Sequence, residues 1–167
     1  MVREWHPEAV FVIDRWDLRF STPGSFDGEL RSLLKEVAPV AGRVFFVSQV
    51  PVIREDTESN LRELVTWHMK HRKDLPLFYP DSAEPLRKQA VAAAESETKS
   101  FSNLSVLRPD LLFYKDDGTI RYESGQAFFY ADSNHLSEMG AEEVRSQFRN
   151  AIAQAVSGSS RQADIAR

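Results

Sequence analysis

One short polar stretch near the end of the sequence brings a carboxylate and an imidazole close together. His135 follows Asp132 by three positions, and the polar residues between them predict a tight loop. Such a loop can fold the carboxylate onto one imidazole nitrogen, leaving the other to take a proton from a hydroxyl. Such a pair would match the base and the orienting carboxylate of a serine, histidine and aspartate triad. The same residues would also suit an ordinary turn with an incidental surface histidine, and the spacing alone leaves both interpretations open.

A helix is predicted directly after this loop. Ser137 is a helix-capping residue type, and Glu138 places a negative charge in the first turn. One apolar stripe follows at helical spacing: Val144, Phe148, Ala151, Ile152 and Ala155. We therefore expect His135 just outside a helix N-terminus. There the helix dipole disfavours an imidazolium and Asp132 favours it, and the sequence does not decide which effect is larger.

Composition limits what the chain can be. Its 167 residues, 42% of them hydrophobic, suit one folded domain, and a net charge of -4 argues against a phosphate-binding surface for nucleic acid. The absence of cysteine excludes a thiol nucleophile and a thiolate metal site. No apolar run approaches the roughly 20 residues that span a bilayer, and the first residues do not resemble a signal peptide. We expect no membrane insertion by this chain and no cofactor.

Apolar runs alternate with helical patterns along the chain. Ala9–Ile13, Arg43–Val47 and Leu104–Leu107 are typical of buried strands. This alternation predicts an α/β fold, a three-layer sandwich of a mainly parallel sheet with helices on both faces. Helical spacing predicts helices from Asp27 or Gly28 to about Val37, within 56–73, and from Asp81 or Ser82 to Ala94. Asp117 and Gly118 predict the turn of a small β-hairpin over residues 111–123.

Two further clusters could be functional. Arg15 and Trp16 follow the first strand at the end where open α/β sheets bind ligands, although Arg15 could simply pair with Asp14 or Asp17. His68 and His71 have no third metal ligand and stand among basic residues, so a solvated basic face is expected there.

Two further expectations complete the predicted layout. We expect Ser48, at a strand end, to be a turn residue rather than a nucleophile. Residues 1–156 are predicted to form the domain, and residues 157–167 a disordered tail.

The stretch Asp132 to Ser137, followed by Gly140 and Ala141, resembles the last conserved block of the SGNH hydrolases. It is most similar to the form D-x-x-H-L-S-x-x-G-A in the C-terminal SGNH domains of acyltransferase family 3 proteins. In that family this aspartate and histidine belong to the catalytic triad, so the resemblance implies those roles for Asp132 and His135. The expected sheet is then of the SGNH, flavodoxin-like kind.

Two other segments carry the same resemblance. The strand that runs into Arg15 and Trp16 is similar to the third block of this branch, with Asp14 where an alanine-like residue is expected. Gln49, Val50 and Pro51 resemble a Gly-Gln-Val-Pro-like turn after the next strand. The resemblance implies that Arg15 and Trp16 line an acyl or sugar pocket.

The sequence departs from the family at the nucleophile. SGNH enzymes begin with a strand that ends in Gly-Asp-Ser, and this tripeptide is absent here. The chain is then expected to be either a fragment or a diverged relative that has lost catalysis. The resemblance places the absent strand beside Ala9–Ile13, which should leave that strand at an open sheet edge.

The function implied by the resemblance is transfer or hydrolysis of an acyl ester, expected to be acetyl, at carbohydrate hydroxyls of a surface polysaccharide. The implied partners are an acyl donor, a carbohydrate acceptor and an upstream membrane acyltransferase domain, in a periplasmic or extracytoplasmic location. Without its serine this chain is expected to be inactive alone. The alternative is a non-catalytic carbohydrate-binding or interaction domain on the same fold.

Overall fold

Three parallel strands form the main sheet of the protein. The computed structural model describes residues 5–19, 25–53, 81, 83–125, 127–132 and 134–165. β1 (Ala9–Val12), β2 (Arg43–Val47) and β3 (Leu104–Leu107) pair in the order β1-β2-β3. All pairings are parallel, as predicted. β2 is central, and because it alternates side chains between two covered faces it is almost wholly buried.

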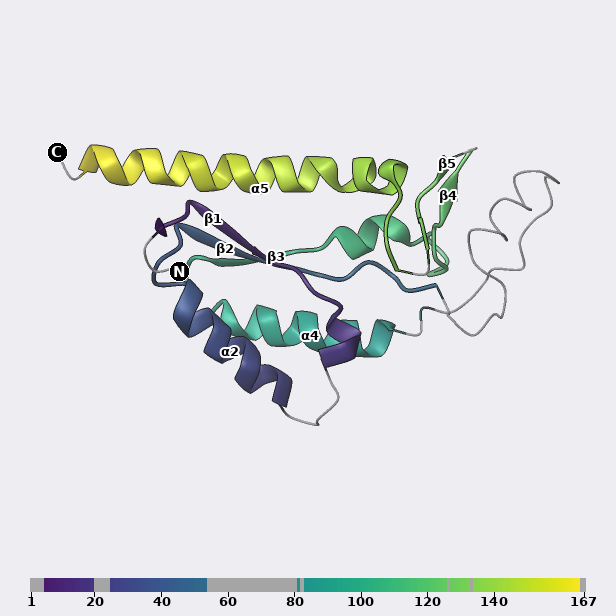
Figure 1. Ribbon diagram of the computed structural model, residues 1–167, viewed down its shortest axis with the longest axis horizontal. Coiled ribbons are helices and arrows are strands. Elements are labelled where there is room, and N and C mark those ends of the chain that lie inside the picture. The colour runs from purple at the N-terminus through teal and green to yellow at the C-terminus, as the bar shows by residue number, and fades with distance from the viewer. Residues whose placement is uncertain are drawn as a thin grey trace. The chain divides into compact units, whose positions relative to one another are not determined.

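Helices cover both faces of this sheet (Figure 1). α2 (Ser25–Val37) and α4 (Glu84–Glu97) lie on one face, where Val44 and Phe46 belong to their hydrophobic core. α5 (Glu138–Ile165) covers the other face, where Phe45 packs with Ala151 and Ala155. Each fully buried side chain of this size stabilises the fold by about 1.5–3 kcal/mol. The predicted three-layer α/β architecture is confirmed.

The chain divides into two compact units. The first is formed by Met1–Gln49, Leu86–Arg108 and Gln147–Arg167, and it contains the three-stranded sheet. The second is formed by Val50–Pro85 and Pro109–Ser146.

The second unit contains the small antiparallel element, with a different layout from the predicted hairpin. The Asp-Gly turn is present, with Gly118 at a φ of 81° and one bridge between Tyr114 and Ile120. Leu111 to Phe113, expected at the start of its first strand, instead belong to a 3-10 helix, η2 (Pro109–Phe113). Proline suits the first helical position, and this turn directs Phe113 onto the rings of Phe129 and Tyr130. The antiparallel pair lies further along, between β4 (Glu123–Ser124) and β5 (Ala127–Phe128).

Several helix details differ from the sequence-based expectations. Ile152 was predicted on the buried stripe of α5 but is 50% exposed, because Ala151 and Ala155 make the contact with the sheet and Ile152 lies about 100° around the helix from Ala151. The tail predicted from Ser157 onward is helical to Ile165. No proline interrupts the helical pattern there.

The start of α4 agrees with the expected cap. Asp81 accepts the N–H of Ala83, and Pro85 falls in the first turn, where its missing N–H costs nothing. The helix predicted within 56–73, with His68 and His71, lies outside the described residues. The division of the chain at residue 156 stays a prediction.

Candidate active site

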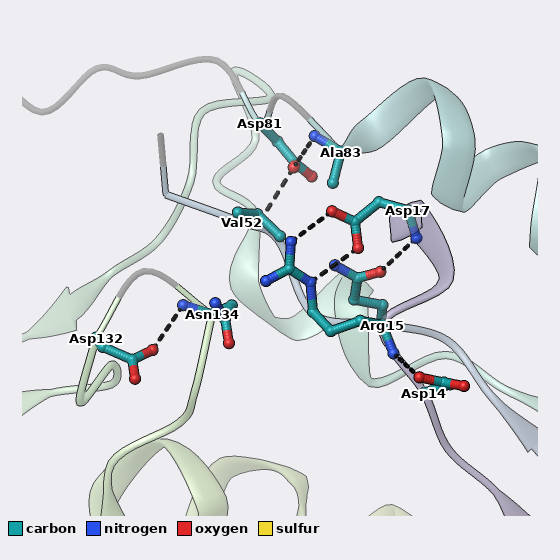
Figure 2. Close-up of polar contacts among 9 residues, drawn as sticks. Asp14, Arg15, Asp17, Val52, Asp81, Ala83, Asp132 and Asn134 are labelled. Carbon is teal, nitrogen blue, oxygen red and sulfur yellow. Dashed lines mark hydrogen bonds and ion pairs between the residues drawn. The ribbon is translucent and has the colours of Figure 1, made fainter. Parts of the chain in front are cut away.

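Asp132 and His135 are in direct contact in the second unit. The Nδ1 atom of His135 lies 2.7 Å from Oδ2 of Asp132. The other carboxylate oxygen, Oδ1, accepts the backbone N–H groups of Asn134 at 2.9 Å (Figure 2) and of His135 at 2.7 Å. The carboxylate is therefore held in an Asx-type turn, which aims its free oxygen at the imidazole. The contact expected from the spacing is present.

The protonation states follow from these partners. Burial alone would raise the pKa of Asp132, but hydrogen bonds from the backbone N–H groups of Asn134 and His135, and then from the imidazole, hold the pKa below its usual value. An ionised carboxylate can only accept hydrogen bonds, so Nδ1 must carry the proton of a neutral imidazole. Nε2 then keeps a lone pair, as a general base requires. The side chains of His135 and Asp132 are 75% and 52% exposed.

Backbone pairing holds the two ends of this loop together. Ala131 donates its N–H to the carbonyl of His135 at 2.8 Å, and Tyr130 and Leu136 form an antiparallel bridge. Ser137 donates its N–H to the carbonyl of Phe129 at 2.9 Å. The loop is thus the tip of a very short hairpin.

Ser137 connects this hairpin to α5. Its Oγ accepts the N–H of Gly140 at 3.2 Å and donates to the carbonyl of Phe128 at 2.5 Å. The predicted helix cap is confirmed, and the cap also ties the helix start to the strand before the loop.

Arg15 and Trp16 belong to the first unit, where both make contacts with other residues of that unit. Arg15 forms a two-pronged ion pair with Asp17 (Figure 2), at 2.9 Å from Nε and 2.6 Å from Nη2. Burial would raise the pKa of Asp17, but the hydrogen bonds from Arg15 and Gln49 and the Arg15 charge hold it below its usual value. Trp16 is 5% exposed, donates from Nε1 to the carbonyl of Val47 at 2.7 Å, and stacks on Phe46. A substrate-binding role for Arg15 and Trp16 stays a prediction.

The structure also bears on Ser48, on metal ligands and on membrane-spanning helices. Ser48 is buried and donates its N–H to the carbonyl of Leu107, in keeping with a structural role. Among the residues that the structure describes, no group of three His, Cys, Asp or Glu side chains could hold a metal ion. In the same part of the chain no helix is both long and apolar enough to cross a membrane.

Sequence reasoning missed two connections in the second unit, one made by the buried Asp81 and one by the partly buried Arg121. Asp81 accepts the N–H groups of Val52 and Ala83 on Oδ1 (Figure 2) and the hydroxyl of Tyr114 on Oδ2 at 2.5 Å. Arg121 binds the carbonyl of Leu112 and the carboxylate of Glu143. The capping position of Asp81 was readable from the sequence, but no local pattern indicates the distant partners.

A parallel sheet between helices, with a carboxylate-backed imidazole in the loop before the last helix, is the architecture of SGNH-type domains. The chain belongs to this family, because the family model described as "SGNH domain (fused to AT3 domains)" matches residues 2–150. No curated protein matches the chain at a significant level.

A solved structure has a similar fold. It is the periplasmic domain of a lipopolysaccharide acetyltransferase from Salmonella ser. Paratyphi A, with a TM-score of 0.58 and 16% sequence identity. The match covers 91% of this chain but 59% of that one, so the chain spans about three-fifths of its structural neighbour. At this identity the likeness establishes the fold alone.

Proposed function

We propose that this chain carries the base half of an SGNH-type acyltransferase or esterase site acting on O-acetyl esters of carbohydrate hydroxyls. His135 takes the proton of the attacking hydroxyl on Nε2, and Asp132 orients the imidazole and stabilises the imidazolium that forms. The observation that carries the proposal is the 2.7 Å contact between the two side chains, in a chain of the SGNH family.

The substrate class rests on the relatives. The structural neighbour is named as a lipopolysaccharide acetyltransferase, and the family's domains are described as fused to AT3 domains. Both support an acetyl group, a carbohydrate acceptor and a membrane acyltransferase domain as partner. Arg15 and Trp16 are proposed to line the acyl or sugar pocket, as the family resemblance implies.

In this proposal the serine nucleophile is supplied by a Gly-Asp-Ser segment that is not among these 167 residues. The sheet supports this arrangement. In the described part of the chain β1 pairs with β2 alone, so one side of β1 can accept another strand.

The test is esterase activity on a small acetyl ester such as p-nitrophenyl acetate. We expect the chain alone to show no turnover that depends on His135. Added with the Gly-Asp-Ser segment encoded by the same gene, it should hydrolyse the ester. His135→Ala and Asp132→Asn should each lower kcat by about 10⁴-fold or more, as in other triads.

The opposite results are equally informative. Activity of the complemented protein that survives His135→Ala would overturn the assignment. Turnover by the chain alone that is lost in Ser48→Ala would move the nucleophile to Ser48.

The second candidate is a non-catalytic carbohydrate-binding domain, which the missing tripeptide favours. It predicts a gene without any Gly-Asp-Ser segment, and binding of an O-acetylated oligosaccharide that Asp132→Asn leaves unchanged. A gene without that segment would replace the catalytic proposal; unchanged binding alone would not, because in that proposal Asp132 orients His135 and does not hold substrate.

A further inference from the structure

Arg121 connects three segments of the second unit. Its Nη1 donates to the carbonyl of Leu112 in η2 at 3.2 Å and to Oε2 of Glu143 in α5 at 2.9 Å. Its guanidinium also lies over the ring of Phe129, with Cζ 4.7 Å from the ring centroid. An arginine in such a position gains from an ion pair, a hydrogen bond and a cation-π contact together.

Two of these contacts reach the two sides of the loop that carries Asp132 and His135. Phe129 directly follows β5 in the segment that enters the loop, and its carbonyl accepts the N–H of Ser137, where the chain leaves the loop. Glu143 lies in the second turn of α5, the helix that Ser137 caps. Arg121 therefore joins the segment that enters the loop, through Phe129, to α5, the helix that follows the loop, through Glu143.

The loop has little other support for its side chains. His135 is 75% exposed and Asp132 is 52% exposed, so packing does not fix either side chain. Their contact depends on the backbone geometry of the loop, because Oδ1 of Asp132 is held by backbone N–H groups. A shift of the segment around Phe129 against α5 would alter that backbone geometry. Catalytic sites tolerate displacements of only about 0.5 Å.

We propose that Arg121, through Phe129 and Glu143, is a positioning residue for the Asp132–His135 pair. The inference rests on the proposed function, since it assigns Arg121 to the orientation of the general base. Arg121 touches no reacting atom. Its effect is on which nitrogen of His135 carries the proton.

The test reads the tautomer of His135 by ¹⁵N NMR in the full chain, in alkaline buffer, with the signal assigned by its loss in His135→Gln. Asp132→Asn sets the reference for a lost contact. Arg121→Met keeps the length of the side chain but removes the ion pair, the hydrogen bond and the cation-π contact. We expect the ratio of Nδ1–H to Nε2–H tautomers to fall by roughly 3- to 10-fold, and Arg121→Lys to restore part of it.

The matched control is Arg145→Met. Arg145 forms an ion pair of 2.6 Å with Glu142 on the exposed side of the same helix and is 61% exposed. The Arg145→Met variant should leave the tautomer ratio of His135 unchanged. If Arg121→Met does not fold, the milder variant Glu143→Gln can be compared with its control Glu142→Gln. Only Glu143→Gln should lower the ratio of Nδ1–H to Nε2–H tautomers.

The two proposals fail in different ways. If Asp132→Asn changes the ratio but Arg121→Met behaves like Arg145→Met, the role of Arg121 is overturned and the base assignment stands. If Asp132→Asn itself leaves the ratio unchanged, the pair is not formed in solution and the proposed function falls, together with this inference.

Discussion

At the residue scale, Asp132 is anchored more by the backbone than by its catalytic partner. Two N–H groups bind one carboxylate oxygen, while the imidazole binds the other. This division separates the two tasks of the residue. One oxygen fixes the side chain, and the other remains available to orient His135.

We expect the carboxyl group of Asp132 to titrate below its ordinary value of 3.8, measured by ¹³C NMR of the carboxyl carbon. Because the pKa is lower in the folded state, the ionised group stabilises the fold above the ordinary value. That contribution is lost as the pH falls through the lower, folded value. His135→Ala should raise the titration midpoint of Asp132 only part of the way to its ordinary value, since the backbone N–H groups still bind the carboxylate. A wild-type midpoint at or above 3.8 would contradict the anchoring.

Tyr114 should contribute measurably to stability through Asp81. Its hydroxyl donates to a carboxylate that is 8% exposed, and hydrogen bonds to buried charged groups are worth about 1.5–3 kcal/mol. We expect Tyr114→Phe to lower the free energy of unfolding in urea by about 2 kcal/mol. In an Asp81→Asn background the same change should cost clearly less, as a double-mutant cycle would reveal. Equal losses in both backgrounds would show that the two groups are not coupled.

At the scale of elements, the site depends on how closely the start of α5 approaches the strand before the loop. Gly140, in the first turn of the helix, lies directly against the carbonyl of Phe129. A β-carbon at Gly140 would stand 2.1 Å from that oxygen, which no side-chain rotation could relieve. The helix can be capped by Ser137 and still touch the entering strand only because residue 140 has no side chain.

Gly140→Ala and Gly28→Ala should therefore have opposite effects on the free energy of unfolding. Nothing lies within 4 Å of a β-carbon built on Gly28 in α2, so alanine should stabilise that helix by about 0.5–1 kcal/mol. Gly140→Ala should destabilise the protein by about 2 kcal/mol or more, since backbone must move. Thermal or urea unfolding of the two variants gives the comparison. A stabilising Gly140→Ala would mean that α5 does not press on Phe129 in solution.

At the scale of the whole molecule, the main sheet has two edge strands within the described residues, β1 and β3. β2 pairs with strands on both sides, whereas in the described residues β1 pairs with β2 alone. Val10 and Val12 pack partly against the core on one face, and Ala9 and Phe11 against the core of the other. An edge strand with apolar side chains on both faces favours pairing with another chain.

Hydrogen exchange should distinguish the two strands. All amides of the central strand, Arg43–Val47, should exchange slowly, whereas in Ala9–Val12 only those directed at β2 should be protected. Either the solution mass should reveal association through β1, or adding the Gly-Asp-Ser segment should protect the remaining β1 amides. A monomer with every β1 amide strongly protected would show that this edge is already covered.

Features that depend on local periodicity and turn chemistry were predictable from the sequence alone. The strand and helix periods predicted the α/β alternation, Asp117 and Gly118 predicted their turn, and Ser137 predicted the start of α5. The contact between Asp132 and His135 also belongs here, because a three-residue spacing within one loop leaves few places for the two side chains.

Which distant groups meet became clear only from the way the elements pack. Trp16 donates to the carbonyl of Val47, and Arg121 binds Glu143, in each case across a separation that leaves no periodic signal in the sequence. Ile152 has the apolar character of its neighbours but faces outward, because small side chains at 151 and 155 set how α5 approaches the sheet. Such partners are selected when the elements pack, and local patterns contain no information about which of many compatible surfaces will come together.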